Sequence, residues 1–128
     1  MLTIRSSFPS LNEVINVAKQ HWGQYAKLKK DMTLTVVLEA KVAKLRPREN
    51  PVCVVFYWYE SNQRRDIDNI SAFGTKVILD GLVEAGILQG DGQKQIPRIR
   101  HYFAVDKDNP RVEVQLLEIS EKEEHDAI

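Results

Sequence analysis

A continuous apolar run at Pro51–Tyr59 constrains the fold more than any other feature of the chain. Its residues, Pro-Val-Cys-Val-Val-Phe-Tyr-Trp-Tyr, carry no charge and are rich in β-branched and aromatic side chains. Such a run is typical of a strand near the centre of a sheet. A second pattern follows at Asn69–Ala85, where apolar residues recur at helical spacing and Gly86 provides a natural end. A central strand followed by a long helix predicts a domain of the α/β type.

Three further strands are predicted around this pair of elements. Residues 2–6 alternate loosely between apolar and polar, and residues 96–105 form a longer extended run. Residues 111–117 also alternate, and a polar turn links them to the preceding run, which predicts a hairpin. Together with the central run, these patterns predict a small mixed sheet of about four strands.

Two helices are predicted between the first strand and the central one. Ser10–Glu13 fits a capping box, so the first helix should begin at Ser10 and run to about His21. Gly23 marks a break, and a second helix is predicted over residues 24–45, although its middle is rich in β-branched residues.

The predicted elements form one α/β (α+β) domain over residues 1–119, with about four strands and three helices. An acidic tail over residues 120–128 is predicted to be disordered.

The composition fits a soluble protein without a membrane partner. Of the 128 residues, 43% are hydrophobic, and no apolar run approaches the length of a membrane span. The first residues lack the regions of a signal peptide, so we expect a cytoplasmic protein. The single cysteine, Cys53, lies among valines and is expected to be buried in a strand. One cysteine permits neither a disulfide within the chain nor a cysteine-based zinc site.

The charges are unevenly distributed, although the formal net charge is zero. Five of the six charged residues from Glu118 onward are acidic, whereas the residues before it carry 17 basic and 13 acidic side chains. The body is therefore mildly basic, which permits phosphate binding without requiring it. Lys27, Lys29 and Lys30 lie in the predicted second helix, where they form either a solvated face or a surface that contacts a DNA backbone.

The segment Arg64–Asn69 holds the clearest candidates for chemistry. Asp66 and Asp68 are two residues apart, and in an extended backbone their side chains would point to the same side. Two like charges held that close favour a cation between them, and carboxylate oxygens suit a hard cation such as Mg²⁺. Aspartate is also a favoured helix N-cap, so the pair could instead serve the following helix. Arg64 and Arg65 suit a phosphate, or simply keep the surface soluble.

Asp91 is a third candidate carboxylate. It lies between Gly90 and Gly92, where the backbone can approach a ligand closely, although Gly-Asp-Gly is also ordinary in turns. The helix of about 17 residues between Asp68 and Asp91 would be roughly 25 Å long. The loop would have to return along this helix for the three carboxylates to meet, so their spacing alone does not predict a shared site.

Three blocks of sequence, in this order, resemble the RusA family of Holliday-junction resolvases. The blocks are Arg64–Ile70, Ile78–Leu88, and Asp91 with Gln93. The family pattern is Asp-x-Asp-Asn, then a helix that ends Leu-Asp-Ala-Leu…Ala-Gly, then an aspartate in the following loop. Pro9–Glu13 and Phe56–Trp58 also look like segments of phage and prophage members, so the resemblance covers about residues 8–118.

The resemblance implies a RusA-like fold and a small homodimeric endonuclease that uses Mg²⁺, with Mn²⁺ as a substitute. Such an enzyme nicks two opposed strands of a four-way DNA junction during recombination and repair, in the cytoplasm of a bacterium or of a phage host. Carried over by matching position, Asp66, Asp68 and Asp91 would bind the metal, which would polarise the scissile phosphate and help to activate water. Two-fold symmetry would supply the two sites that paired nicks need.

Lys76 marks a departure from the family pattern. Family members place a lysine about one helical turn after Asp-x-Asp, but Ala72 occupies that position here. If the block around Asp80 sets the alignment, Lys76 matches the family lysine and lies about 6 Å further along the helix. Lys76 would then act at the phosphate, or else form a surface pair with Asp80.

Two other functions fit parts of the pattern. A protein that binds branched DNA without cutting it would use the basic faces, with the aspartates as caps, but would not need three of them. A phosphatase with an aspartate nucleophile places Asp-x-Asp directly after a buried strand, whereas Glu60–Arg65 intervenes here. Trp22, Trp58 and Tyr102 could stack on unpaired bases near a junction, although a core position suits Trp58 better.

Overall fold

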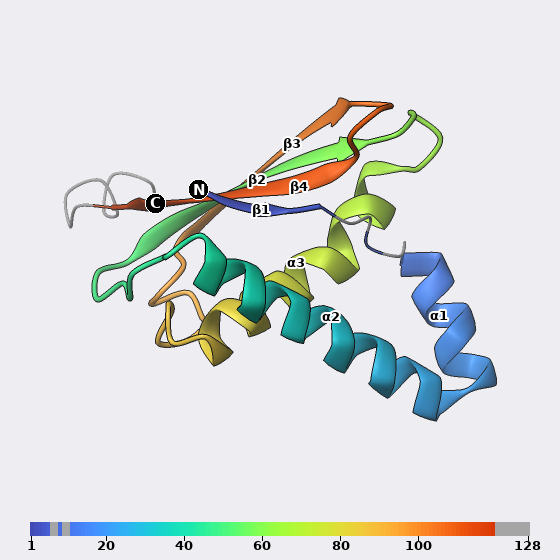
Figure 1. The fold of residues 1–128 in the computed structure, drawn as a ribbon, viewed down its shortest axis with the longest axis horizontal. Helices are drawn as coiled ribbons and strands as arrows, with labels where there is room; N and C mark the ends of the chain where they lie inside the picture. The colour runs from blue at the N-terminus through green and yellow to red at the C-terminus, as the bar shows by residue number, and fades with distance from the viewer. Residues whose placement is uncertain (6–7, 9–10, 120–128) are drawn as a thin grey trace.

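The structure is a computed structural model that describes residues 1–5, 8 and 11–119. Its helices all lie on one face of a four-stranded mixed sheet, which makes an α+β fold (Figure 1). The predicted capping residue Ser10 and the acidic tail over 120–128 lie outside the described residues. In chain order the elements are β1 (Leu2–Ile4), α1 (Leu11–Gln20), α2 (Trp22–Val42), β2 (Val52–Glu60), α3 (Ile67–Glu84), β3 (Arg98–Val105) and β4 (Arg111–Glu118).

Strand β2 lies inside the sheet, as its apolar run predicted. The strand order is β1-β4-β2-β3, with β2 parallel to β3 and antiparallel to β4. Helix α3 connects the parallel pair, since parallel neighbours need a crossover connection. Val54, Phe56 and Trp58 of β2 point into the core beneath the helices, whereas Cys53 and Val55 are buried in a smaller cluster on the other face.

The predicted hairpin between the last two strands is wrong. Strand β4 pairs with β2 and β1, and β3 pairs with β2. The link over residues 106–110 passes the end of β2, where the backbone N–H of Asp106 donates to the carbonyl oxygen of Glu60 at 2.8 Å. Because β2 is apolar on both faces, it gains a strand on each side instead of lying at an edge. Val112 and Val114 of β4 then face the helices and are buried.

Helix α2 begins earlier than its sequence predicted. The chain breaks at His21, which has φ −147° and ψ 85°, and Gly23 lies inside the first turn of the helix. The β-branched middle of α2 is nevertheless helical. Thr33 and Thr35 are accommodated because each hydroxyl donates to the carbonyl oxygen four residues earlier, at 2.8 and 3.1 Å.

Helix α3 packs on both the sheet and α2, and this packing positions the candidate site. Val77, Ile78 and Leu82 are fully buried, as the helical spacing predicted. At Gly81 the two helices approach so closely that a β-carbon would lie 2.5 Å from Cγ1 of Val36. The contact at Gly81 fixes the second half of α3 against α2, while its first turn lies near the end of β2 and its last turn leads into the loop that holds Asp91.

Candidate active site

Asp66 and Asp68 lie at the start of α3, and both are exposed. Asp66 is the N-cap residue, with φ −68° and ψ 150°, and its carbonyl accepts the first helical hydrogen bond from the N–H of Ile70 at 3.1 Å. Its side chain makes no cap hydrogen bond. Asp68 is in the first helical turn, where its carboxylate accepts from the N–H of Asn69 at 3.0 Å. Of the two aspartates that could have capped the helix, Asp66 therefore occupies the N-cap position, and it does so through its backbone alone.

The two aspartates do not form an extended pair. Asp66 has extended dihedral angles, but Ile67 and Asp68 are already helical. The shared orientation expected of residues i and i+2 in a strand does not apply to such a junction. Both carboxylates instead sit at a helix N-terminus, where the helix dipole stabilises negative charge.

Arg65 is engaged within the protein, whereas Arg64 faces solvent. The Arg65 guanidinium contacts carboxylate oxygens of Glu13 at 2.9 Å and Glu60 at 3.3 Å, and donates to the carbonyl oxygen of Phe8 at 3.1 Å. It thereby ties the start of α3 to α1 and to the end of β2. Arg64 is exposed, and its backbone N–H donates to the side-chain oxygen of Asn62 at 2.9 Å. Arg64 is thus the better placed of the two for a phosphate.

Lys76 lies between Asp80 and Asp91. Its ammonium nitrogen is 3.1 Å from Oδ1 of Asp80 and 3.5 Å from Oδ2 of Asp91, and the hydrogen bond to Asp80 raises the pKa of Lys76. Lys29 of α2 lies 3.8 Å from the other Asp80 oxygen. The loop after α3 therefore does return along the helix, but it brings Asp91 only to the level of Lys76.

The predicted carboxylates consequently form two groups in one chain. Asp66 and Asp68 occupy the start of α3, whereas Asp91 is held near Lys76, which is eight residues beyond Asp68 and about 12 Å further along the helix axis. Within the described ranges, no three Asp, Glu, His or Cys side chains come close enough to hold a metal ion. Carboxylate oxygens suit Mg²⁺. For three carboxylates to bind one ion, however, at least one of them must come from outside the single chain as it is arranged here.

The α2 lysines border an open groove between α2 and α3. Lys29 and Lys30 line this groove beside Trp22, which is 69% exposed and lies 5.1 Å from the ring of Tyr25. The groove has mixed charge, because three acids also line it: Asp31, Asp80 and Glu84. Lys27 is exposed as well. Of the predicted stacking residues, Trp22 and Tyr102 are exposed, whereas Trp58 is core.

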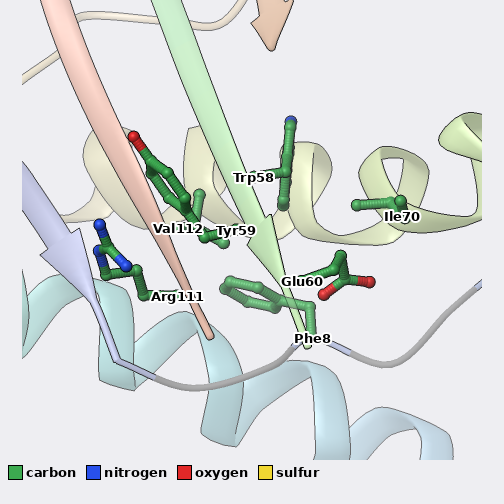
Figure 2. A pocket seen from close by; sticks show the side chains of 7 residues that line it. All are labelled: Phe8, Trp58, Tyr59, Glu60, Ile70, Arg111 and Val112. Atoms are coloured by element: carbon green, nitrogen blue, oxygen red, sulfur yellow. The ribbon is translucent and has the colours of Figure 1, made fainter. Parts of the chain in front are cut away.

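A small cavity at the end of β2 is structural. Its volume is about 10 Å³, enough for about one water molecule. Figure 2 shows the side chains around it, which come from β2, β4, α3 and the segment before α1: Phe8, Trp58, Tyr59, Glu60, Ile70, Arg111 and Val112. No substrate fits in this space, so this cavity is not a candidate binding site.

Comparisons with known proteins assign no family to this chain. No model of a known protein family matches the chain, and a search of curated proteins finds no relative. Among the described residues, no helix is long and apolar enough to cross a membrane.

Proposed function

We propose that this chain is a Mg²⁺-dependent, structure-selective endodeoxyribonuclease that resolves four-way DNA junctions by paired nicks. The observation that carries the proposal is the start of α3, where Asp66 and Asp68 are both exposed and Asp66 makes no side-chain cap hydrogen bond. Carboxylates that are not used to close the helix remain available to a ligand. The resemblance of residues 64–70 and 78–93 to RusA resolvases supports the same function.

Each candidate residue has a distinct role in this proposal. Asp66, Asp68 and Asp91 would hold Mg²⁺, which when bound polarises the scissile phosphate and activates water. Lys76 would place a positive charge at the phosphate, and the exposed Arg64 would contact the DNA backbone nearby. Lys27 and Lys30 of α2 would add further backbone contacts, on a surface whose mixed charge favours weak, salt-sensitive binding.

The proposed reaction needs two copies of the chain. Paired nicks require two sites related by symmetry. Because β2 and β3 are parallel, Asp66 follows one end of the sheet, whereas the loop with Asp91 leads into the other end. A second copy in antiparallel orientation would bring the Asp91 loop of one chain toward the Asp66 end of the other. Dimerisation would thus supply what a single chain lacks.

A non-catalytic protein that binds branched DNA is the second candidate. The separation of Asp91 from Asp66 and Asp68 within one chain favours it, since a binder needs no shared carboxylate site. The same exposed basic residues would then serve binding alone.

A cleavage assay on a synthetic four-way junction separates the two candidates. With Mg²⁺ we expect symmetric nicks in opposed strands, no cutting of a linear duplex of the same sequence, and no cutting after chelation of the metal. If the protein binds the junction but makes no nicks with either Mg²⁺ or Mn²⁺, the nuclease proposal is wrong and the non-catalytic binding protein is favoured. Equal cutting of the linear duplex would remove junction selectivity from the proposal.

Lys76→Met is expected to lower the cleavage rate by at least about tenfold, because it removes a positive charge from the phosphate site. The stability of the fold should change by less than about 0.5 kcal/mol, since the Lys76 side chain is 59% exposed and its ion pairs are at the surface. Single-turnover cleavage and urea unfolding measure the two effects. The matched control is Lys107→Met, an exposed lysine in the β3–β4 link. If Lys76→Met cuts at the normal rate, the role of Lys76 is limited to its surface ion pairs with Asp80 and Asp91.

A further inference from the structure

Strand β3 is an unprotected edge of the sheet. It lies at the outer end of the strand order, and each of its residues after Arg98 is exposed (Figure 1). It carries neither proline nor an acidic residue, and its pairing with β2 runs without a bulge from Arg98 to Val105. Its large apolar side chains are 37–50% exposed: Ile99, Tyr102, Phe103 and Val105. Its charged residues are Arg98 and Arg100, and a long edge strand that exposes several apolar side chains is normally covered or paired.

The pairing of β3 with β2 determines which backbone N–H and C=O groups of β3 point away from the sheet. The N–H of Asp106 donates to the carbonyl oxygen of Glu60 in β2, so Asp106 faces inward. Successive residues of a strand turn their N–H and C=O groups to opposite edges, so the even-numbered residues of β3 also face β2. The outward groups therefore belong to the odd-numbered residues: Ile99, His101, Phe103 and Val105. Among the described residues, no strand pairs with this edge.

We propose that this edge binds β3 of a second copy of the chain, antiparallel and about a two-fold axis at Tyr102. In this register Ile99 lies opposite Val105 of the second copy, and His101 lies opposite Phe103. Every outward N–H and C=O of β3 then meets another outward group, which allows about eight hydrogen bonds between the chains. Because outward residues must face outward residues, the axis is perpendicular to the sheet, and both sets of helices lie on the same face.

The side chains of β3 are complementary to themselves in this register. On the helix face, Ile99 meets Val105 and His101 meets Phe103, so each pair is apolar or aromatic and occurs twice. Histidine and phenylalanine rings already stack within the strand, with centroids 6.2 Å apart. The His101 ring accepts the indole N–H of Trp58 at Nδ1, at 3.0 Å, and partial burial lowers its pKa. A neutral ring suits a phenylalanine neighbour.

The opposite face of the sheet supports the same pairing. Tyr102 lies there, stacked on Tyr57 at 5.4 Å, and would meet Tyr102 of the second copy at the axis. A single register thus satisfies the outward backbone groups and the exposed apolar side chains twice over, which identifies a second copy as the partner. The surface is inferred from this geometry alone; only its use in junction cleavage rests on the proposed function.

Cysteine cross-linking of the full chain, without DNA or metal, tests the register. Tyr102→Cys should form a disulfide-linked dimer on mild oxidation, because directly opposed residues that are not hydrogen bonded have Cα atoms about 4.5 Å apart. Ala104→Cys is the matched control, since it lies opposite Arg100 and not opposite itself. The native Cys53 is 3% exposed and should not react. If Tyr102→Cys stays monomeric, or Ala104→Cys cross-links equally well, the proposed pairing is wrong.

Light scattering tests the interface independently. The unmodified protein should have about twice its chain mass of 14.7 kDa, and Ile99→Lys should weaken the dimer by at least about tenfold. Adding Val105→Glu should restore the dimer, because the new charges then face each other, whereas adding Val105→Lys should not. Both positions are exposed, so circular dichroism should be unchanged. A dimeric Ile99→Lys variant would overturn the interface, and so would a wild type that is monomeric in solution. Paired nicks made by two copies that meet only on the junction would then leave the proposed function standing without this interface.

Discussion

Asp66→Asn and Asp68→Asn are each expected to lower the rate of junction cleavage by at least about 100-fold. Asparagine keeps the size of the side chain but removes the charge that would hold the cation. Junction binding should remain, or become tighter, because one source of repulsion with the phosphates is lost. Folding stability should fall by no more than about 1 kcal/mol, because both side chains are exposed and lose only their interaction with the helix dipole.

Two further variants make this prediction specific. Asp91→Asn should also abolish cutting if its carboxylate joins the other two, although it lies beside Lys76 in the single chain. Asp108→Asn, an exposed acid in the β3–β4 link, should cut normally. Rates and binding are measured on the same labelled junction, by gel cleavage and by anisotropy. If the Asp66 and Asp68 variants both cut at the normal rate, the nuclease proposal is wrong. If Asp108→Asn loses as much cleavage rate as they do, the loss comes from the change in net charge and not from a metal site.

The helices and strands were predictable because the spacing of apolar residues along the chain shows which side chains are buried. The run Pro51–Tyr59 became β2, and the apolar positions of the 69–85 pattern from Ile70 to Leu82 are buried in α3. The order of strands was not predictable in the same way. Alternation over residues 111–117 fixes which face of β4 is buried, but it does not say whether β2 or β3 lies beside that strand. Which strands become neighbours depends on which strand occupies the centre of the sheet, and that is decided only when the whole core packs together.

The candidate site was predictable only where it is local in sequence. Asp66 and Asp68 are adjacent to a helix pattern, so their position at the start of α3 follows from the sequence. The contacts that fix Arg65 and Asp80 join residues far apart in the chain: Arg65 with Glu13, and Asp80 with Lys29. Such ion pairs arise when α1 and α2 pack against α3. No spacing rule could have found them.

Gly81→Val is expected to destabilise the fold by about 2 kcal/mol, because it overpacks the contact between α2 and α3. A β-carbon at this position would lie 2.5 Å from Cγ1 and 2.7 Å from Cβ of Val36. Val36 is fully buried, so it has no free space into which to move. The better helix propensity of valine offsets only a few tenths of a kcal/mol. Urea unfolding should show a lower midpoint, and Tm should fall by about 6–10 °C.

Gly23→Ala is the control that separates overpacking from the loss of a glycine. A β-carbon at Gly23 has no atom within 4 Å, and the residue lies in the first turn of α2. Alanine should therefore leave stability unchanged or raise it by up to about 1 kcal/mol. If Gly81→Val were as stable as the wild type, the close approach of α2 and α3 would be refuted. If Gly23→Ala were equally destabilising, the effect at Gly81 could not be assigned to Val36, and the fixed position of α3 that presents Asp66 and Asp68 would lose its physical basis.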